Sequence, residues 1–410
     1  MAGREPDVPT ILVTDRSLNT IDVIDGFTNL DVTIKADEPD SGTVDVPARP
    51  EMMALLQPGN RIVLIDSGEI FTAGPIEKPG PYNWGVGGGD EGSEASGAGT
   101  VTVSWGDDSA LIAGRTVYPD PAKPASSQKP PDDDPDADDP GPAWTYTGPA
   151  GTAMTQMVNL NAGPGALANR RIPRLVIGDG AGLGSSIKVS ERFTALGDAL
   201  RAAATAGNTE LGFRTRQVDR DIIFEVFEPT DRSDTARFSR GLGNLRSVTY
   251  DPSAPTATTA LVAGQGEGSD RQIVEVSDAD AVARWWRLEE WVDRRDTNDT
   301  DQLTQAGRDK LAEDGEQVQL ATVTVDTEDL RFGRDFGLLD RVSVEVYPAA
   351  PGLDALVVTD LVRSAHLQYT PKSGRYLSVV VGSQEATSDP AWVTFARRLA
   401  RRLAHIERQP

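Results

Sequence analysis

Residues 61–76 read RIVLIDSGEIFTAGPI, and this stretch decides the fold class of the first part of the chain. The runs 61–66 and 69–76 are rich in β-branched and apolar residues, and Ser67-Gly68 links them. A two-residue link that contains glycine matches the twist of two paired strands. The stretch therefore predicts a β-hairpin, and Gly74-Pro75 predicts a bulge or a sheet edge near its end.

Strand patterns continue on both sides of this hairpin. Apolar and polar residues alternate in 20–24 and 30–34, the period that lets a strand bury one face, while 50–56 (PEMMALL) predicts a single helical turn. We therefore expect residues 1–118 to form a β-rich domain, with the glycine-rich stretch 79–99 as a flexible hairpin tip.

Residues 119–142 contain seven aspartates and eight prolines, a composition typical of an extended, solvated linker. Asp134, Asp136 and Asp138 have the spacing of a calcium loop, but Asp139 occupies the place of the turn glycine. The linker interpretation is therefore preferred.

Residues 143–244 predict an α+β domain. A helix is expected from Ser190, the proposed N-cap, to residue 207, because Phe193, Leu196 and Leu200 recur at helical spacing. Two strands are expected at 211–218 and 222–227, and a small domain that mixes a packed helix with paired strands is α+β.

The remaining chain is predicted to contain a second β-rich domain, an insert and a terminal helix. Residues 245–270 and 318–385 form the β-rich domain, with clear alternation at 342–346 and 377–381. Residues 271–317 form a Trp- and charge-rich helical insert with a helix at 303–311, so the overall class is a β-rich α+β architecture with several domains.

Three tryptophans, Trp285, Trp286 and Trp291, stand among alternating charges in the insert. They fit an amphipathic segment whose tryptophans are buried in a core or interface, and they also fit a platform for carbohydrate. The paired acids Glu289 and Glu290 suggest a glycosidase, but adjacent side chains usually diverge, whereas such catalysis needs two facing carboxyls.

Residues 386–410 predict a basic amphipathic helix. Apolar residues recur at spacings of four, three, four and three, and arginines occupy the other faces. This helix could dock on its own domain, form a coiled coil or contact an anionic membrane. The residues predicted to make a partner or trimer contact are Trp392, Leu399, Leu403, Ile406, Arg397, Arg398, Arg401 and Arg402.

Composition excludes several classes of function. A formal net charge of −23 argues against stable binding of nucleic acid, which requires clustered basic residues. With no cysteine and with His366 and His405 isolated, no catalytic triad, metal site or cofactor is predicted. The sequence contains no run of about 18 apolar residues, so no membrane insertion is predicted. We expect synthesis in the cytoplasm of the host.

A set of short motifs resembles the minor tail proteins that form the baseplate hub, or tail tip, of actinobacteriophages with siphovirus tails. Their order and spacing together carry the resemblance, which spans nearly the whole chain. The motifs are Asp15-Arg16, 59–63 (GNRIV), 73–77 (AGPIE), 107–117 (DDSALIAGRTV), Asp231-Arg232, 238–244 (FSRGLGN), 264–271 (GQGEGSDR), 286–296 (WRLEEWVDRRD) and 332–344 (FGRDFGLLDRVSV).

The resemblance implies two β-barrel-like tube domains, α+β domains between them, and a homotrimer that adapts a six-fold tail tube to a three-fold tip. Expected partners are the distal tail protein ring, the tape-measure protein and receptor-binding proteins of the tail tip, with DNA passing without specific binding. The chain would be a structural, non-enzymatic protein located in the virion. A virion-borne carbohydrate-binding or carbohydrate-active protein is the alternative.

Overall fold

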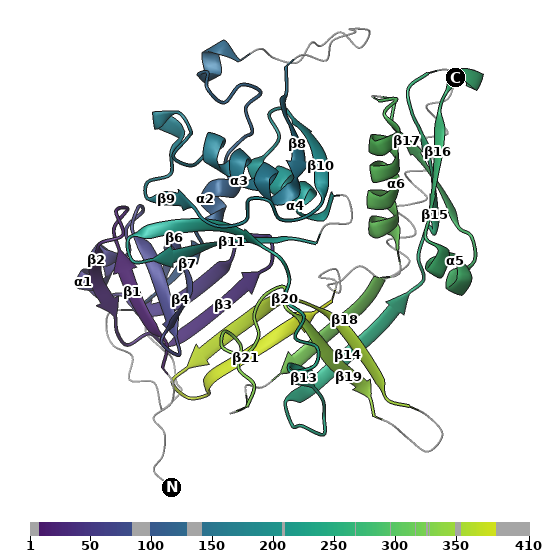
Figure 1. Cartoon of the computed structure of the whole chain (residues 1–410). Coiled ribbons are helices and arrows are strands. Elements are labelled where there is room, and N and C mark those ends of the chain that lie inside the picture. Colours follow the sequence, from purple (N-terminus) through teal and green to yellow (C-terminus); the bar gives the residue numbers. More distant parts are fainter. Residues whose placement is uncertain are drawn as a thin grey trace.

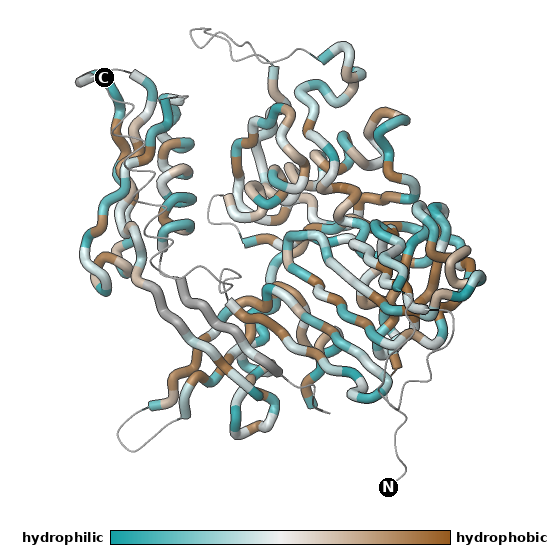
Figure 2. The backbone as a smooth tube through the Cα atoms, turned by 180° about the vertical axis from the view of Figure 1, so that it is seen from behind, coloured by the Kyte–Doolittle hydropathy of each residue, from teal (hydrophilic) through white to brown (hydrophobic). Residues whose placement is uncertain are grey.

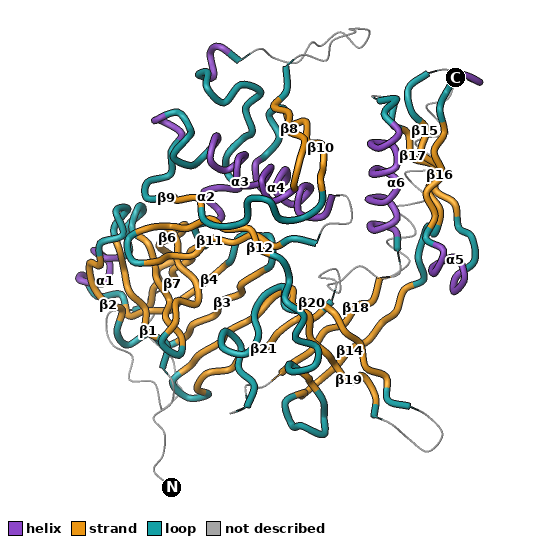
Figure 3. Tube along the Cα trace, in the orientation of Figure 1, coloured by secondary structure: helices purple, strands orange, loops and turns teal. Residues whose placement is uncertain are grey.

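The computed structural model describes residues 8–83, 99–128, 142–206, 210–266, 268–295, 297–315, 317–324, 327, 329–348 and 354–382. Figure 1 shows a large sheet built from both ends of the sequence, a helical region above it and a separate insert to one side. In Figure 3 strands make up most of the lower part of the molecule, while the longer helices lie in the helical region and in the insert.

The first part of the chain is β-rich, as predicted. Its elements are β1 (Thr10–Thr14), β2 (Thr20–Ile24), β3 (Asn29–Lys35), β4 (Ser41–Pro47), α1 (Pro50–Leu55), β5 (Arg61–Asp66), β6 (Glu69–Asn83), β7 (Thr100–Gly106) and α2 (Ser109–Ala113). The hairpin at 61–76 is confirmed: Asp66 pairs with Glu69 across the turn, and Ser67 and Gly68 have φ of 52° and 88°. Positive φ at both turn residues is the geometry that suits a twisted hairpin.

Strand β6 changes partner at the predicted bulge. It pairs with β5 up to Pro75 and with β7 from Ile76 onward. Gly74 lies at this change, where a Cβ would overlap the Gly106 carbonyl oxygen and the Asp107 backbone. Glycine is therefore required here by close backbone approach.

The two β-rich blocks share one sheet, which differs from the separate tube domains that were predicted. The later strands are β13 (Arg237–Phe238), β14 (Leu245–Ser253), β18 (Gln317–Thr324), β19 (Arg341–Tyr347), β20 (Leu356–Thr370) and β21 (Gly374–Val381). Strand β20 pairs antiparallel with β3, from Ser364 opposite Lys35 to Tyr369 opposite Leu30.

The pairing runs along an open path, β14-β18-β21-β20-β3-β4-β7-β6-β5-β1-β2, with β19 and β13 as a branch. Among the described strands this 13-stranded sheet closes no barrel, and the β-barrel-like tube domains stay a prediction. One apolar core includes residues from both blocks, among them Val32, Trp105 and Leu367. Apolar and polar segments alternate along its strands in Figure 2, as one-sided burial requires.

The middle part is α+β and has its own core. Its elements are η1 (Ala125–Ser127), β8 (Trp144–Pro149), α3 (Ala150–Asn161), η2 (Ala168–Arg170), β9 (Leu175–Ile177), β10 (Ser186–Glu191), α4 (Leu196–Thr205), β11 (Gly212–Val218) and β12 (Asp221–Phe227). The predicted strands at 211–218 and 222–227 are confirmed as β11 and β12, which pair antiparallel.

The predicted start of the helix in this part was wrong. Ser190 belongs to strand β10, which pairs with β8, and α4 begins only at Leu196. Phe193 has φ of 56°, which is incompatible with a right-handed helix. The spacing that suggested a helix therefore runs across a strand end and a turn.

The insert contains a three-stranded sheet as well as helices. Its elements are β15 (Thr259–Ala263), η4 (Gly268–Asp270), β16 (Ile273–Ser277), α5 (Ala279–Trp285), β17 (Glu289–Asp293) and α6 (Thr300–Asp314). Strand β15 pairs antiparallel with β16 and parallel with β17, so it belongs to the insert and not to the second β-rich block. The predicted helix at 303–311 lies within α6. The described helices include none long and apolar enough to cross a bilayer.

Candidate functional site

A buried carboxylate cluster lies where the large sheet meets the α+β part. Oδ1 of Asp107, just after β7, accepts hydrogen bonds from the Asp40 backbone N–H (3.0 Å) and the Ser109 hydroxyl (2.6 Å). Its Oδ2 accepts one from the Thr215 hydroxyl of β11 (3.0 Å). A single carboxylate thus joins the β3–β4 loop, the start of α2 and strand β11. We call this cluster, with its neighbours Arg61 and Asp108, the polar junction.

Arg61 and Asp108 form a buried ion pair in the polar junction. Their side chains are only 5% and 2% exposed, and the guanidinium contacts both carboxylate oxygens, with Nε 3.3 Å from Oδ1. The guanidinium also donates to the hydroxyl of Thr14 (3.3 Å) and to the side-chain oxygen of Gln217 (2.9 Å). Because Gln217 is on β11, this arginine connects two strands of the sheet to the α+β part.

Burial raises the pKa values of the acids in the polar junction. Burial raises the pKa of Asp108 to about 6, although the positive charge of Arg61 acts to lower it. Burial and the charge of Asp107 together raise the pKa of Asp40 well above its usual range, and burial also raises that of Asp107. The carboxyl hydrogen bonds from Ser109 and Thr215 oppose this increase at Asp107. Deprotonating these acids therefore costs more in the folded protein than in the unfolded chain.

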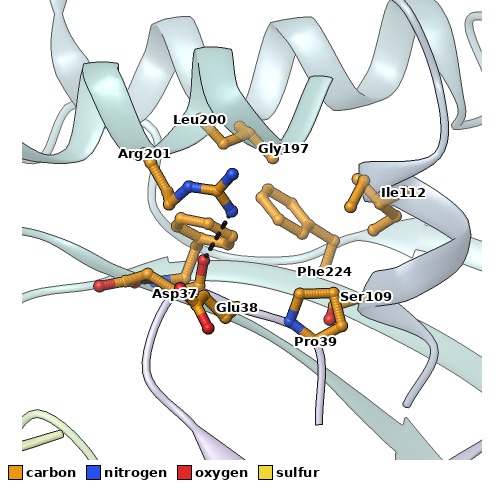
Figure 4. A pocket seen from close by; sticks show the side chains of 11 residues that line it. Asp37, Glu38, Pro39, Ser109, Ile112, Gly197, Leu200, Arg201 and Phe224 are labelled. Atoms are coloured by element: carbon orange, nitrogen blue, oxygen red, sulfur yellow. Dashed lines mark hydrogen bonds between the residues drawn. The ribbon is translucent and has the colours of Figure 1, made fainter. Parts of the chain in front are cut away.

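The space beside the polar junction is too small for a substrate. A cavity of about 10 Å³ lies between the β3–β4 loop, α2 and α4 (Figure 4), which is about the volume that one water requires. Arg201 donates to the Asp37 backbone carbonyl (3.4 Å), and Figure 4 shows its guanidinium above Asp37. Asp37 Oδ1 accepts from the Phe213 backbone N–H (3.3 Å). Acids with raised pKa values can donate protons in catalysis, but here they hold two parts of the molecule together.

Three of the motifs that carried the resemblance meet at the polar junction. Arg61 belongs to 59–63, residues 73–77 supply the Ala73 carbonyl that accepts from the Asp108 N–H (3.0 Å), and 107–117 supply the acids. The motifs contain Arg61, Asp107 and Asp108, but nothing in the sequence pointed to Thr215 or Gln217 on a distant strand.

The structure separates the tryptophans of the insert. Trp285 ends α5 and is half-buried, whereas Trp286 is 81% exposed and Trp291, on β17, is 50% exposed. Glu289 and Glu290 are successive residues of β17 and point to opposite faces, as their adjacency predicted. Within the described residues no three His, Cys, Asp or Glu side chains are grouped to hold a metal ion.

The predicted partner helix lies outside the described residues, together with all eight of its contact residues from Trp392 to Ile406. The same is true of most of the predicted hairpin tip (84–98), of residues 129–141 of the predicted linker, and of His405. His366 lies on β20, with Nε2 2.8 Å from Oδ1 of Asp31 on β3. It contributes to the pairing of the two β-rich blocks.

Comparison with known families decides the assignment. Residues 10–383 match the model of the family described as Siphovirus ReqiPepy6 Gp37-like protein. The chain belongs to this family. A search of curated proteins gives no match.

The fold of this siphovirus Gp37-like chain is shared with solved phage tail proteins. The prophage tail protein gp18 from Listeria monocytogenes EGD-e is 12% identical, with 96% of this chain and 99% of that chain covered and a TM-score of 0.53. The tail protein from Neisseria meningitidis MC58 is 13% identical (92% and 97% covered, TM-score 0.52). The 43 kDa tail protein of prophage MuSo2 from Shewanella oneidensis is 11% identical (92% and 98% covered, TM-score 0.51).

The family match and the shared fold confirm the predicted resemblance at the level of siphovirus tail proteins. They agree with the predicted location, the tail of the virion. The corresponding fold is β-rich with few helices.

Proposed function

We propose that this chain is a structural, non-enzymatic protein of the tail tip, where three copies form a baseplate hub ring. The ring would adapt the six-fold tail tube to a three-fold tip and close or open the DNA channel. The observation that supports this proposal is the continuous sheet shared by the two β-rich blocks.

The shared sheet joins two β-rich blocks within each copy. Three copies would then supply six β-rich blocks, which is the number needed to match a six-fold tube with a three-fold symmetric ring. The sheet ends at β2 on one side and β14 on the other, each with one partner strand in the described chain. Unpaired strand edges favour pairing with another chain, so these edges are candidate contacts between copies.

Strand β2 has the features of a contact edge. Ile21 and Val23 are 46% and 40% exposed, although the charged Asp22 lies between them and the β1–β2 register shifts beside Thr14. Charges and bulges usually protect solvent-facing edges, so the two exposed apolar side chains are the feature of β2 that favours a contact. An exposed apolar edge is therefore consistent with a strand that is covered when copies assemble.

The polar junction would keep the α+β part in a fixed position on the ring. Buried hydrogen bonds from β11 to Asp107 and Arg61 connect this part to the sheet without a hinge at that point. A fixed arrangement suits a platform that must hold other proteins. The partners proposed for it are the distal tail protein ring, the tape-measure protein and receptor-binding proteins, and 386–410 is a further proposed partner or trimer contact.

The acidity of the chain suits passage of DNA through the ring. A net charge of −23 repels phosphates, so DNA would pass through without specific binding. This requires acidic residues on the channel wall. A structure of the assembled ring with a neutral or basic wall would contradict the proposal for DNA passage.

Immunogold electron microscopy tests the location, with antibody against this chain on particles from the source. Label confined to the tail tip is the expected result, and label along the tube or on the capsid would contradict it. Quantitative mass spectrometry of purified tails then tests the ring: three copies per tail are expected, and six copies or one copy would overturn the trimer.

A further inference from the structure

The sheet of the insert has one covered face and one open face. Val262, Val276 and Leu303 pack between the sheet and α6. In both Figure 1 and Figure 2, α6 lies between this sheet and the rest of the molecule. Alternation along the strands therefore directs Glu275 and Trp291 to the opposite face, which points away from the large sheet.

The outward positions of this face combine apolar and charged side chains. On β16 they are Ile273, Glu275 and Ser277, on β17 they are Glu289, Trp291 and Asp293, and on the central strand β15 they are Thr259, Leu261 and Ala263. Three of these nine are acidic, whereas the centre of a protein–protein interface is usually depleted of charge. We call these nine positions, with the neighbouring Trp286, the outer face of the insert.

The charges on the outer face are paired with one another. Arg287 donates two hydrogen bonds to Glu275 (2.9 and 2.8 Å) and one to Glu289 (2.6 Å). Arg271 forms an ion pair with Asp293 and lies over the Trp291 ring, 5.7 Å from its centroid, and Arg295 also pairs with Asp293 (3.2 Å). The outer face is thus locally compensated on a chain that carries −23 overall. It offers fixed polar groups to an uncharged ligand and has no excess charge to attract a polyanion.

Trp286 is held outward by an unusual backbone. It has φ of 62°, which is rare for a bulky residue and marks a strained position that the surrounding structure must maintain. The buried hydroxyl of Thr258 donates to the Trp286 carbonyl (2.9 Å) and accepts from the Leu288 N–H (2.8 Å). These bonds fix the backbone of the turn that carries the exposed indole.

We propose that the outer face of the insert binds a neutral polysaccharide, with Trp286 and Trp291 as stacking platforms. Indole rings pack against the apolar faces of sugar rings, and the arginine–carboxylate pairs provide donors and acceptors for sugar hydroxyls. The inference does not depend on the hub proposal, because it rests on the geometry of the insert alone.

Affinity electrophoresis of the full chain tests this proposal. Native gels contain dextran, galactomannan or a soluble β-glucan as neutral polysaccharides, and polygalacturonate as an anionic one. We expect retardation by at least one neutral polysaccharide and none by polygalacturonate. Trp286→Ala and Trp291→Ala should each weaken the apparent affinity about ten-fold, equivalent to about 1.4 kcal/mol.

Control variants separate binding from folding. Tyr347 on β19 is an aromatic residue that is 50% exposed and lies outside the insert. The Tyr347→Ala variant should therefore bind polysaccharide like the parent chain. Trp291→Tyr keeps an aromatic ring and should retain more affinity than Trp291→Ala. Unchanged circular dichroism shows that each variant is folded. No retardation by any neutral polysaccharide, retardation that survives both tryptophan changes, or retardation by polygalacturonate alone would overturn the proposal.

Discussion

Replacing Arg61 by methionine should destabilise the protein strongly at neutral pH. Methionine keeps much of the length of the side chain but leaves the Asp108 carboxylate, 2% exposed, without its cation. The change also removes the hydrogen bonds to Thr14 and Gln217. Breaking one side of a buried ion pair costs about 3–5 kcal/mol. For a protein of this size, such a loss of unfolding free energy corresponds to a decrease in melting temperature of about 10 °C.

The pH dependence of this variant gives a sharper test. The pKa of Asp108 is already raised to about 6 in the folded protein, above the ordinary value of 3.8, and loss of Arg61 raises it further. A raised acid pKa means that folding takes up a proton, so the penalty is complete above the folded pKa and disappears as pH falls toward 4. The melting temperature of Arg61→Met should therefore approach that of the parent chain as the pH is lowered from 8 to 5.

Two further variants identify the cause of the loss. Arg61→Met combined with Asp108→Asn removes the unpaired charge and should recover most of the stability, because replacing both partners of a buried pair is often nearly neutral. Arg287→Met breaks an exposed pair in the insert and should leave the melting temperature unchanged. Thermal unfolding followed by circular dichroism measures all four proteins. A double variant as unstable as Arg61→Met, or a deficit independent of pH, would refute the reasoning.

Three other changes test different parts of the structure. Gly42→Ala would place a Cβ against the buried Trp105 ring, and such overpacking should cost about 1–3 kcal/mol in urea unfolding; an unchanged midpoint would contradict it. Ile21→Lys puts a charge on edge strand β2 and should block incorporation into tails without lowering the melting temperature, and normal incorporation would exclude β2 as a contact. Deletion of 390–410 should impair tail assembly, measured by electron microscopy of complemented particles, and unaffected assembly would remove the helix from the proposed contacts.

Local features of the fold were predictable because nearby residues determine them. The hairpin β5–β6 follows from Ser67-Gly68, whose φ values fit a tight turn. The β11–β12 hairpin is similar, with Asp219 at φ of 52° in its turn. In both hairpins the alternating pattern and the turn chemistry agree, so register is fixed over a few residues.

Features that depend on distant contacts could not be predicted. Nothing in 29–35 indicates that β3 pairs with β20, which lies more than 300 residues later in the chain. The insert was predicted as a Trp- and charge-rich helical insert, with an amphipathic segment around the tryptophans and a helix at 303–311. The positive φ of Trp286 instead ends α5 and lets 289–293 pair with β15.

The polar junction shows the same limit at the level of the site. Two of the motifs that carried the resemblance contain Arg61 and Asp108. Their partners Thr215 and Gln217 are ordinary polar residues of an alternating strand, and only the packing of β11 on the sheet gives them a role.

The pairing of β3 with β20 has a consequence for biosynthesis. About 330 residues separate the paired positions, as in His366 opposite Thr33. Strand β3 therefore emerges from the ribosome long before β20 has been synthesised. During that interval β3 is an open strand edge beside β4, able to pair with another nascent chain. Fragments that end before residue 356 should therefore aggregate during expression, and supplying the missing strand in trans should keep them soluble.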